Sequence, residues 1–454
     1  MAERPVGVVA RRRRGRQRSG LGAGAGTALC VGAVLGPGAL TLTSTAAAAA
    51  GPGSVLAWLV LVGVSLPVAR VFAALGARNP DGGGVAASVE RAFGARLAGP
   101  VGWWFYWAVP LGVPAAALIG GEYAAAAAGW GRSAVPVIAL LVVGAAYGAN
   151  LVGLRLSGRL QLLMVGALAS LLAVTIAVSG TGVRAAHFSP FLPHGWSSVG
   201  VAAGMLFFAV AGWEAISHLS AEFTDPARDL PRATLLAWAI VAVLYVGLAL
   251  VTVGVLGVRA GATTTPLTLL LEQGLGTSAR PVAAAAALLL TFGAVNAYLA
   301  GAARLGEALG RRGAMPRRIT VGPAEGSGVP RRSLTVVTLA SSGVVAAAAY
   351  GFIDLETLLR ATSACLAAVT LAGLAAATVL LEGRRSLRVS AAVSCGVVAV
   401  VLVFCGPFLL VPAVLAMAAT AFAAGASARA LHRARRRCPD HSRAESVGRA
   451  GSPR

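Results

Sequence analysis

The sequence predicts an all-α polytopic membrane protein, and three observations support this prediction. Hydrophobic residues make up 57% of the 454 residues, and only 12% are charged. The apolar runs are long enough to cross a hydrocarbon core about 30 Å thick, which takes ~20 helical residues. The runs are continuous and rich in Ala, Leu and Val, without the period-two alternation of outer-membrane barrels. The spans are therefore expected to be helices.

Twelve transmembrane helices are expected along the chain. Boundaries predicted from apolar runs hold to within about two to four residues. The expected spans lie at about 21–50, 54–77, 97–128, 133–153, 160–180, 198–221, 233–257, 281–306, 333–352, 355–381, 389–405 and 408–430.

The distribution of arginine supports this count independently. All 38 basic residues are Arg, and 33 of them fall on the inner side if the N-terminus is cytoplasmic. A miscounted span would scramble this asymmetry, which the positive-inside rule predicts. Both termini are therefore expected in the cytoplasm. Abundant Ala, Gly and Arg without Lys suggest a GC-rich bacterial genome. The expected location is the bacterial cytoplasmic (inner) membrane. The outer side receives Arg132, Arg184, Arg259, Arg280 and Arg360.

The net charge of +22 and the run Arg11–Arg14 would also fit a nucleic-acid-binding arm. Their position argues against nucleic acid. The run lies in a basic tail at 1–20, directly before the first span, and a second basic tail at 431–454 follows the last span. Positive charge at these places sets the topology and attracts anionic headgroups. Anionic membrane lipid is therefore the expected partner of the tails.

Two spans carry a helix-breaking sequence. Gly36-Pro37-Gly38 interrupts the first span, and Gly212-Trp213-Glu214 interrupts the sixth. A bilayer tolerates non-helical backbone only where it is buried in protein or lines a cavity, because unpaired amides and carbonyls are costly in hydrocarbon. Breaks at matching places in two halves are typical of secondary transporters. A signal peptide cleaved near Ala46-Ala47-Ala48 would remove the first break, and is the less favoured interpretation.

The chain also resembles a known transporter family. The matching stretches are 32–38, 80–86, 92–94, 109–116 and 212–232. They resemble the amino acid, polyamine and organocation (APC) permeases, and within them the bacterial exporters of methionine and branched-chain amino acids. The resemblance covers about residues 20 to 380. It implies a LeuT-like fold of two inverted five-helix repeats, at 21–180 and 198–381, with two further helices at 389–430.

The resemblance implies a substrate at the crossing of spans 1 and 6, and the physics of helix ends agrees. A half-helix N-terminus carries about half a positive charge and unpaired amides, which favour a carboxylate. Freed carbonyls would take the ammonium group. Gly36 and Gly38 match the family's glycines, whereas Pro37 departs from the pattern and removes one amide donor. A proline kink that only stabilises helix packing is the alternative for Pro37.

The expected pocket walls are apolar and offer no second charge, which favours neutral hydrophobic amino acids such as leucine, isoleucine, valine and methionine. Direction depends on gradients and on any coupled ion, and the exporter or exchanger assignment follows from the resemblance. The expected substrate-binding residues are Val34, Leu35, Gly36, Pro37, Gly38, Phe208, Ala211, Gly212 and Trp213.

Glu214 and His218 are candidates for a proton relay or a gate. They lie four residues apart, on one helical face below the break, and an imidazole titrates near neutral pH. The alternative is that Glu214 caps the broken helix and His218 bonds to a neighbour. An ionised Glu214 facing the pocket would instead favour a cationic amino acid or polyamine antiporter. No Lys occurs in span 5, so lysine-based coupling is excluded and the coupling ion stays open.

Other polar residues within spans are expected to be structural. Glu122 lies near the outer end of span 3 as an interface carboxylate, and Asn296 and Thr362-Ser363 can join helices. The sequence contains no H-E-x-x-H or G-x-S-x-G motif and no paired intramembrane aspartates, so no enzyme activity, cofactor or metal is expected. Short tails of about 20 residues disfavour a non-transporting sensor. The oligomeric state is not predicted.

Overall fold

The computed structural model describes residues 22–78, 84–153, 158–216, 223, 225–322 and 329–437. Within these ranges the chain is helical and contains no strand, which confirms the all-α class. The α-helices are α1 (Ala23–Val34), α2 (Gly38–Ala50), α3 (Ser54–Arg78), α4 (Gly84–Phe93), α5 (Ala95–Ala128), α6 (Ala134–Leu151), α7 (Gly158–Ser179), α8 (Trp196–Val210), α10 (Pro226–Leu256), α11 (Pro266–Leu275), α12 (Ala279–Arg311), α13 (Arg317–Thr320), α14 (Arg331–Ala349), α15 (Leu355–Leu380), α16 (Arg385–Phe404) and α17 (Leu410–Arg437).

Short 3-10 helices join or extend these elements. They are η1 (Gly51–Gly53), η2 (Gly180–Gly182), η3 (Ala185–Phe188), η4 (Trp213–Ala215), η6 (Gly257–Ala262), η7 (Gly276–Ser278) and η8 (Gly406–Leu409).

Ten helical stretches of the described residues are long and apolar enough to cross a membrane, so the chain is a polytopic membrane protein. The first stretch, Gly38–Arg78, has 41 residues and joins α2 to α3 through η1. Two further apolar helices, α1 and α8, have only 12 and 15 residues. Each ends where the sequence predicts a break. The count of twelve spans and the inverted repeat remain predictions.

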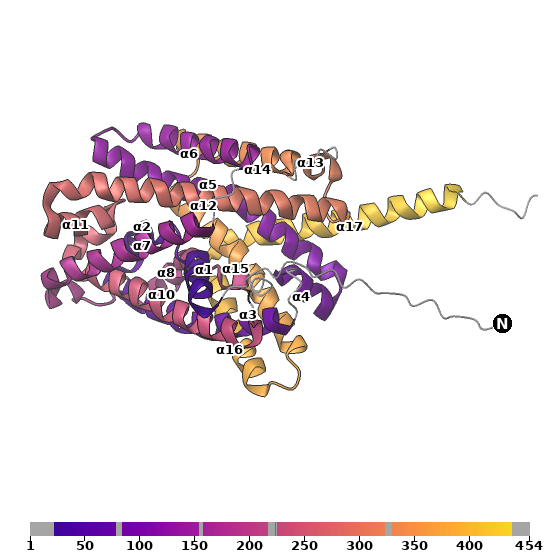
Figure 1. Ribbon diagram of the computed structural model, residues 1–454, viewed down its shortest axis with the longest axis horizontal. Helices are drawn as coiled ribbons and strands as arrows, with labels where there is room; N and C mark the ends of the chain where they lie inside the picture. Colours follow the sequence, from indigo (N-terminus) through magenta and orange to yellow (C-terminus); the bar gives the residue numbers. More distant parts are fainter. Residues whose placement is uncertain are drawn as a thin grey trace, which may run out of the picture.

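Two long helices, α5 and α12, lie side by side along the bundle (Figure 1). Small residues allow this close approach, as is common between membrane helices. A Cβ atom on Gly120 of α5 would overlap the side chain of Thr291 on α12, and one on Gly306 of α12 would overlap the ring of Tyr106. On the other side of the bundle α1 packs against α10, and α2 packs against α8.

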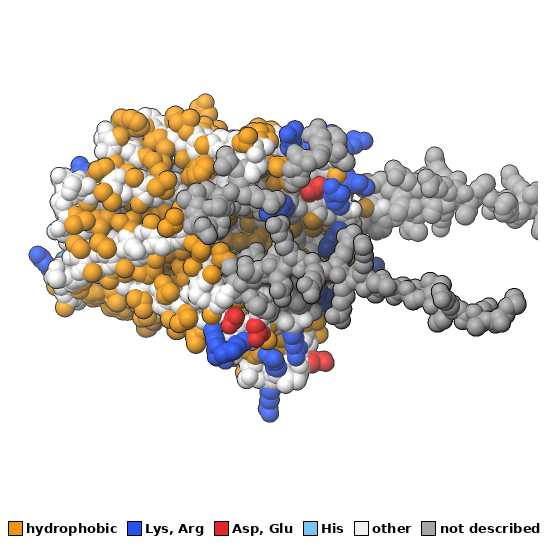
Figure 2. All heavy atoms as spheres, in the orientation of Figure 1, with side chains coloured by type: hydrophobic (Ala, Val, Ile, Leu, Met, Phe, Trp, Pro, Cys, Tyr) orange, Lys and Arg blue, Asp and Glu red, His pale blue; other side chains and the backbone are white. Residues whose placement is uncertain are grey.

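The surface agrees with a protein that sits in a membrane. Figure 2 shows hydrophobic side chains over the sides of the molecule, and arginines toward the end where α4 and α13 lie. Arg311 and Arg312, at the end of α12 beside α13, have side chains 64% and 67% exposed. The short helix α11 lies at the opposite end (Figure 1).

The predicted tails are described only in part. The N-terminal tail at 1–20 lies outside the described residues. The last helix, α17, continues to Arg437, into the segment at 431–454 that was expected to follow the last span as a tail.

Candidate functional site

The predicted break in the first span separates α1 from α2. Helix α1 ends at Val34, and the amide of Leu35 still donates to the Val31 carbonyl oxygen at 2.7 Å. Pro37 directly precedes α2 with φ −61° and ψ −18°. Its missing amide costs little there, because the first amides of a helix have no partner within the helix.

The predicted break in the sixth span follows α8. Ala211 and Gly212 form a turn between Val210 and η4. Gly212 has φ +124°, a backbone conformation that glycine adopts readily and other residues avoid. A Cβ atom at Gly212 would also overlap the carbonyl oxygen of Ala33 in α1. The two breaks therefore cross in direct backbone contact.

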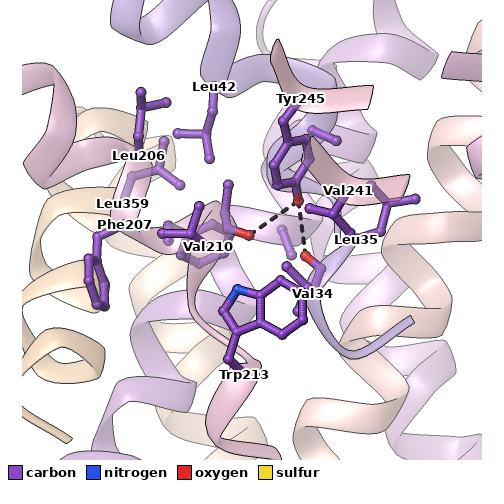
Figure 3. Close-up of a cluster of buried hydrophobic side chains, with 14 of the residues drawn as sticks. Val34, Leu35, Leu42, Leu206, Phe207, Val210, Trp213, Val241, Tyr245 and Leu359 are labelled. Atoms are coloured by element: carbon purple, nitrogen blue, oxygen red, sulfur yellow. Dashed lines mark hydrogen bonds between the residues drawn. The ribbon is translucent and has the colours of Figure 1, made fainter. Parts of the chain in front are cut away.

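Tyr245 of α10 joins the ends of both broken helices (Figure 3). Its hydroxyl lies 2.9 Å from the carbonyl oxygen of Val34 and 3.2 Å from that of Ala209. These carbonyls belong to the last turns of α1 and α8, where no amide of the same helix is left to bond them. Tyr245 is 1% exposed, and its ring centroid lies 4.9 Å from that of Trp58. Part of the carbonyl set expected to bind an ammonium group is thus already bonded.

Glu214 caps the break in the sixth span. Its carboxylate accepts a hydrogen bond from the Gly212 amide at 3.0 Å, and the residue is 3% exposed. This bond is the contact that the capping interpretation predicts. His218 lies outside the described residues, so the proton relay remains a prediction.

A cavity of about 560 Å³ opens onto the break in the first span. Its size falls within the range of about 300–1,000 Å³ that is usual for small-molecule sites. The end of α1, with Gly32 and Ala33, and the break at Leu35, Gly36 and Pro37 form one wall. The other walls come from α6, α7, α12 and α14, and include Asn150, Met164, Val165, Leu290, Asn296, Tyr298, Arg304 and Leu334.

This arrangement brings two helix ends of opposite polarity to one cavity. The C-terminal end of α1 carries a partial negative charge, and the N-terminal end of α2 carries a partial positive charge. The cavity walls next to them are mostly apolar. A molecule with one cationic group, one anionic group and an apolar side chain complements such a site.

A sequence model of the family described as amino acid permease matches residues 25–427. The match includes both breaks and the cavity. The chain belongs to the amino acid permease family. Proteins of this family are transporters and not enzymes, in agreement with the absence of catalytic motifs in the sequence.

Individual relatives of this permease are also transporters by name. The chain is 37% identical over 375 residues to the uncharacterized amino acid permease YecA of Bacillus subtilis. The aligned residues make up 81% of this chain and 86% of YecA. The chain is 31% identical over 257 residues to the L-methionine/branched-chain amino acid exporter YjeH of Escherichia coli, covering 56% and 60% of the two chains. A shorter stretch of 104 residues, 23% of this chain and 22% of the relative, is 32% identical to the branched-chain amino acid permease BcaP of Bacillus subtilis.

The predicted site residues lie close together in the permease, but only some of them line the cavity. Leu35, Gly36 and Pro37 line the cavity. At Gly36 an added Cβ would meet the Tyr298 hydroxyl at 3.6 Å, an ordinary contact. At Gly38 it would come within 2.7 Å of Leu42 and 3.1 Å of Phe208. The space beside Gly38 is therefore filled by side chains, and of these two glycines Gly36 is the one that lines the cavity.

The remaining predicted residues lie behind the break. Val34, Phe208 and Trp213 are buried in an apolar cluster with Val210 and Leu206, most of which Figure 3 shows. Ala211 and Gly212 form the turn at the crossing of the two breaks. These residues support the broken helices and do not line the cavity in the described part of the structure.

Sequence reasoning missed Tyr245 and Tyr298, and both lie beside the breaks. A tyrosine in the middle of an apolar span is a usable signal, because a buried hydroxyl needs a partner. Of the polar residues assigned to helix packing, Asn296 and Ser363 join helices, whereas the Thr362 hydroxyl donates to the Leu358 carbonyl of its own helix. Asn150 donates to the Asn296 side-chain oxygen at 2.7 Å, and the Ser363 hydroxyl donates to the Met205 carbonyl at 3.2 Å. Asn150 and Asn296 also line the cavity.

Proposed function

We propose that this amino acid permease moves neutral hydrophobic amino acids, namely leucine, isoleucine, valine and methionine, across the bacterial cytoplasmic membrane. It acts by alternating access, as an exporter or exchanger. The names of the relatives, a methionine/branched-chain exporter and a branched-chain permease, support this substrate class.

The observation that carries the proposal is the cavity at the broken helix. The α-carboxylate of the substrate faces the N-terminal end of α2, and the ammonium group faces the C-terminal end of α1. An aliphatic or thioether side chain lies against the apolar walls, which include Met164, Val165 and Leu290. Gly36 lets the ligand approach the backbone.

A cationic amino acid or a polyamine is the weaker candidate. Its second positive charge requires a carboxylate in the cavity. Glu214 is buried, does not line the cavity in the described part of the structure, and is bonded to the Gly212 amide. The one charged side chain among the described lining residues is Arg304, which repels a cation. Both features favour a neutral substrate.

The proposed orientation follows from charge. The arginine-rich end with α4 and α13 lies in the cytoplasm, together with both termini, as the positive-inside rule requires. The cavity extends from the break to Arg304 and Pro330, which border that end, so the proposed orientation places the cavity on the cytoplasmic side of the break.

Counterflow in proteoliposomes tests the substrate class. Vesicles are loaded with unlabelled leucine, methionine, arginine or putrescine, and the entry of trace labelled leucine is followed over a range of pH. We expect internal leucine and methionine to accelerate entry, and arginine and putrescine to have no effect. Absence of leucine counterflow under every loading would contradict the proposal.

A further inference from the structure

Tyr298 of α12 places a hydroxyl group beside the break in the first span. Its oxygen would lie 3.6 Å from a Cβ atom built on Gly36, so it stands next to the glycine backbone. Tyr298 and Gly36 both line the cavity, and Tyr298 is 37% exposed. Within the described part of the chain, its hydroxyl has no hydrogen-bond partner. A polar group at the break is therefore free to bond to a ligand.

The second tyrosine at the break is not available in this way. The Tyr245 hydroxyl already lies within hydrogen-bond distance of the Val34 and Ala209 carbonyl oxygens, to which it donates. A hydroxyl carries a single hydrogen, and Tyr245 does not line the cavity in the described part of the structure. Of the two tyrosines, Tyr298 is the one with a donor for a bound molecule.

The break itself is short of amide donors. Pro37 has no amide hydrogen, so it offers nothing to a carboxylate at the start of α2. The next amides along the chain, those of Ala39 and Leu40, donate to the Gly36 and Pro37 carbonyl oxygens at 3.1 Å. These three positions therefore leave a carboxylate without an amide partner. A hydroxyl beside Gly36 supplies a donor at the place where the proline removes one.

Two other polar side chains of the cavity are less well placed. The side-chain nitrogen of Asn150 donates to the Ala146 carbonyl at 2.9 Å and to the Asn296 side-chain oxygen at 2.7 Å, which uses both of its hydrogens. Arg304 lies six residues beyond Tyr298, which corresponds to about 9 Å along α12. Tyr298 is the side chain whose donor is both unused and next to the break.

We propose that Tyr298 is a substrate-binding residue whose hydroxyl donates a hydrogen bond to the α-carboxylate of the bound amino acid. The inference rests on the proposed function and names the side chain that recognises the carboxylate. The partial positive charge of the α2 end acts on the same group. A hydrogen bond to an ionised acceptor is shorter and stronger than one between neutral groups.

This contact gives the site a means of selection. A site that is built to bond a substrate group discriminates against analogues without that group, because its own polar atom is then left unpaired. Simple amines and polyamines carry no carboxylate. Tyr298 therefore favours amino acids over amines, in addition to the repulsion of cations by Arg304.

The experiment measures binding of labelled leucine to the purified protein, with leucine amide as competitor. Leucine amide keeps the ammonium group and the side chain but replaces the carboxylate with a neutral group. For Tyr298→Phe we expect the Kd of leucine to rise about tenfold, since a bond to a charged group is lost. The Kd of leucine amide should rise less than about threefold, since only a neutral bond is lost.

Two controls accompany the variant. Tyr298→Phe should keep the unfolding midpoint of the parent, because the hydroxyl has no partner among the described residues. Tyr147→Phe removes a hydroxyl of α6 that bonds to the Thr335 hydroxyl at 3.0 Å and does not line the cavity in the described part of the structure. This variant should bind leucine with the Kd of the parent.

Three results would contradict the inference, and they differ in what else they contradict. An unchanged Kd of leucine in Tyr298→Phe would remove Tyr298 from the site and leave the substrate class intact. An equal loss for leucine and leucine amide would mean that the hydroxyl contacts a group that both molecules share. Absence of leucine binding by the parent would contradict the proposed function itself, and the role of Tyr298 with it.

Discussion

At the scale of single residues, Gly212 and Tyr245 determine how the two broken helices meet. Gly212 has a positive φ and lies against the Ala33 carbonyl, so no side chain fits there. Tyr245 bonds the last-turn carbonyls of α1 and α8 at the same crossing. Gly212 permits the close contact between the two helices, and Tyr245 bonds to carbonyl oxygens that have no partner within their own helices.

Gly212→Ala should destabilise the protein by about 2 kcal/mol or more. Strained backbone costs about 1–3 kcal/mol, and overlap with the Ala33 oxygen adds to this cost. The thermal unfolding midpoint in detergent measures the effect, and leucine counterflow should be lost with it. Gly63→Ala in α3 is the control, since a Cβ atom there meets nothing within 4 Å. Equal midpoints for the two variants would show that the crossing tolerates a side chain.

Tyr245→Phe should cost about 1–3 kcal/mol, because it leaves two buried carbonyl oxygens without their hydroxyl partner. The ring still packs against Trp58, so the loss belongs to the hydroxyl alone. Tyr350→Phe, at a residue 80% exposed, is the matched control and should be neutral. The unfolding midpoints of both variants test this prediction. A neutral Tyr245→Phe would mean that water replaces the hydroxyl.

At the scale of elements, proline alone does not break a span. Helix α5 contains Pro100, Pro110 and Pro114 and remains one helix, and α3 contains Pro67. A single proline removes one hydrogen bond and kinks a helix. Glycine on both sides of Pro37 lowers helix propensity further, by about 1 kcal/mol each. The combination explains why the first span is interrupted between α1 and α2, whereas α3 and α5 stay continuous through their prolines.

The two glycines of that break should respond differently to a methyl group. Gly36→Ala should leave the unfolding midpoint nearly unchanged, because the Cβ would make only an ordinary contact with the Tyr298 hydroxyl at 3.6 Å. It should raise the leucine concentration for half-maximal counterflow by about tenfold, or 1.4 kcal/mol. Gly38→Ala should instead lower stability by about 1 kcal/mol, because the ends of the Leu42 and Phe208 side chains must shift to make room for the Cβ. The reverse pattern would place the ligand beside Gly38.

At the scale of the whole molecule, the apolar sides and the arginine-rich end define how the protein sits in the membrane (Figure 2). The apolar surface favours lipid around the bundle, and in the proposed orientation the positive end lies in the cytoplasm. The same proposed orientation places the cavity on the inner side of the break.

Reporter fusions test this orientation. A fluorescent protein that matures only in the cytoplasm should fluoresce when it is joined to either terminus. A phosphatase that is active only outside should be active when it is inserted between η2 and η3, in the loop that precedes α8. The opposite result at both places would reverse the proposed membrane orientation.

Much of the architecture was predictable because apolar run length and paired glycines act locally. The helical class and the positions of both breaks follow from these features. The site was predictable only in outline. Nothing in the local sequence separates Gly36, beside the cavity, from Gly38, whose space Phe208 fills from another span. Tyr298 lies beside Gly36, and Glu122 accepts a hydrogen bond from Thr264, although each pair is more than 140 residues apart in the sequence.

The sequence by itself determined that this chain is a helical membrane protein with two interrupted spans, since bilayer thickness and backbone hydrogen bonding impose those constraints on any single segment. The tertiary structure decided which freed backbone groups remain available. Tyr245 bonds two carbonyls, Glu214 bonds the Gly212 amide, and the ends of α1 and α2 are left beside the cavity. These contacts depend on how distant helices pack, which no local pattern records.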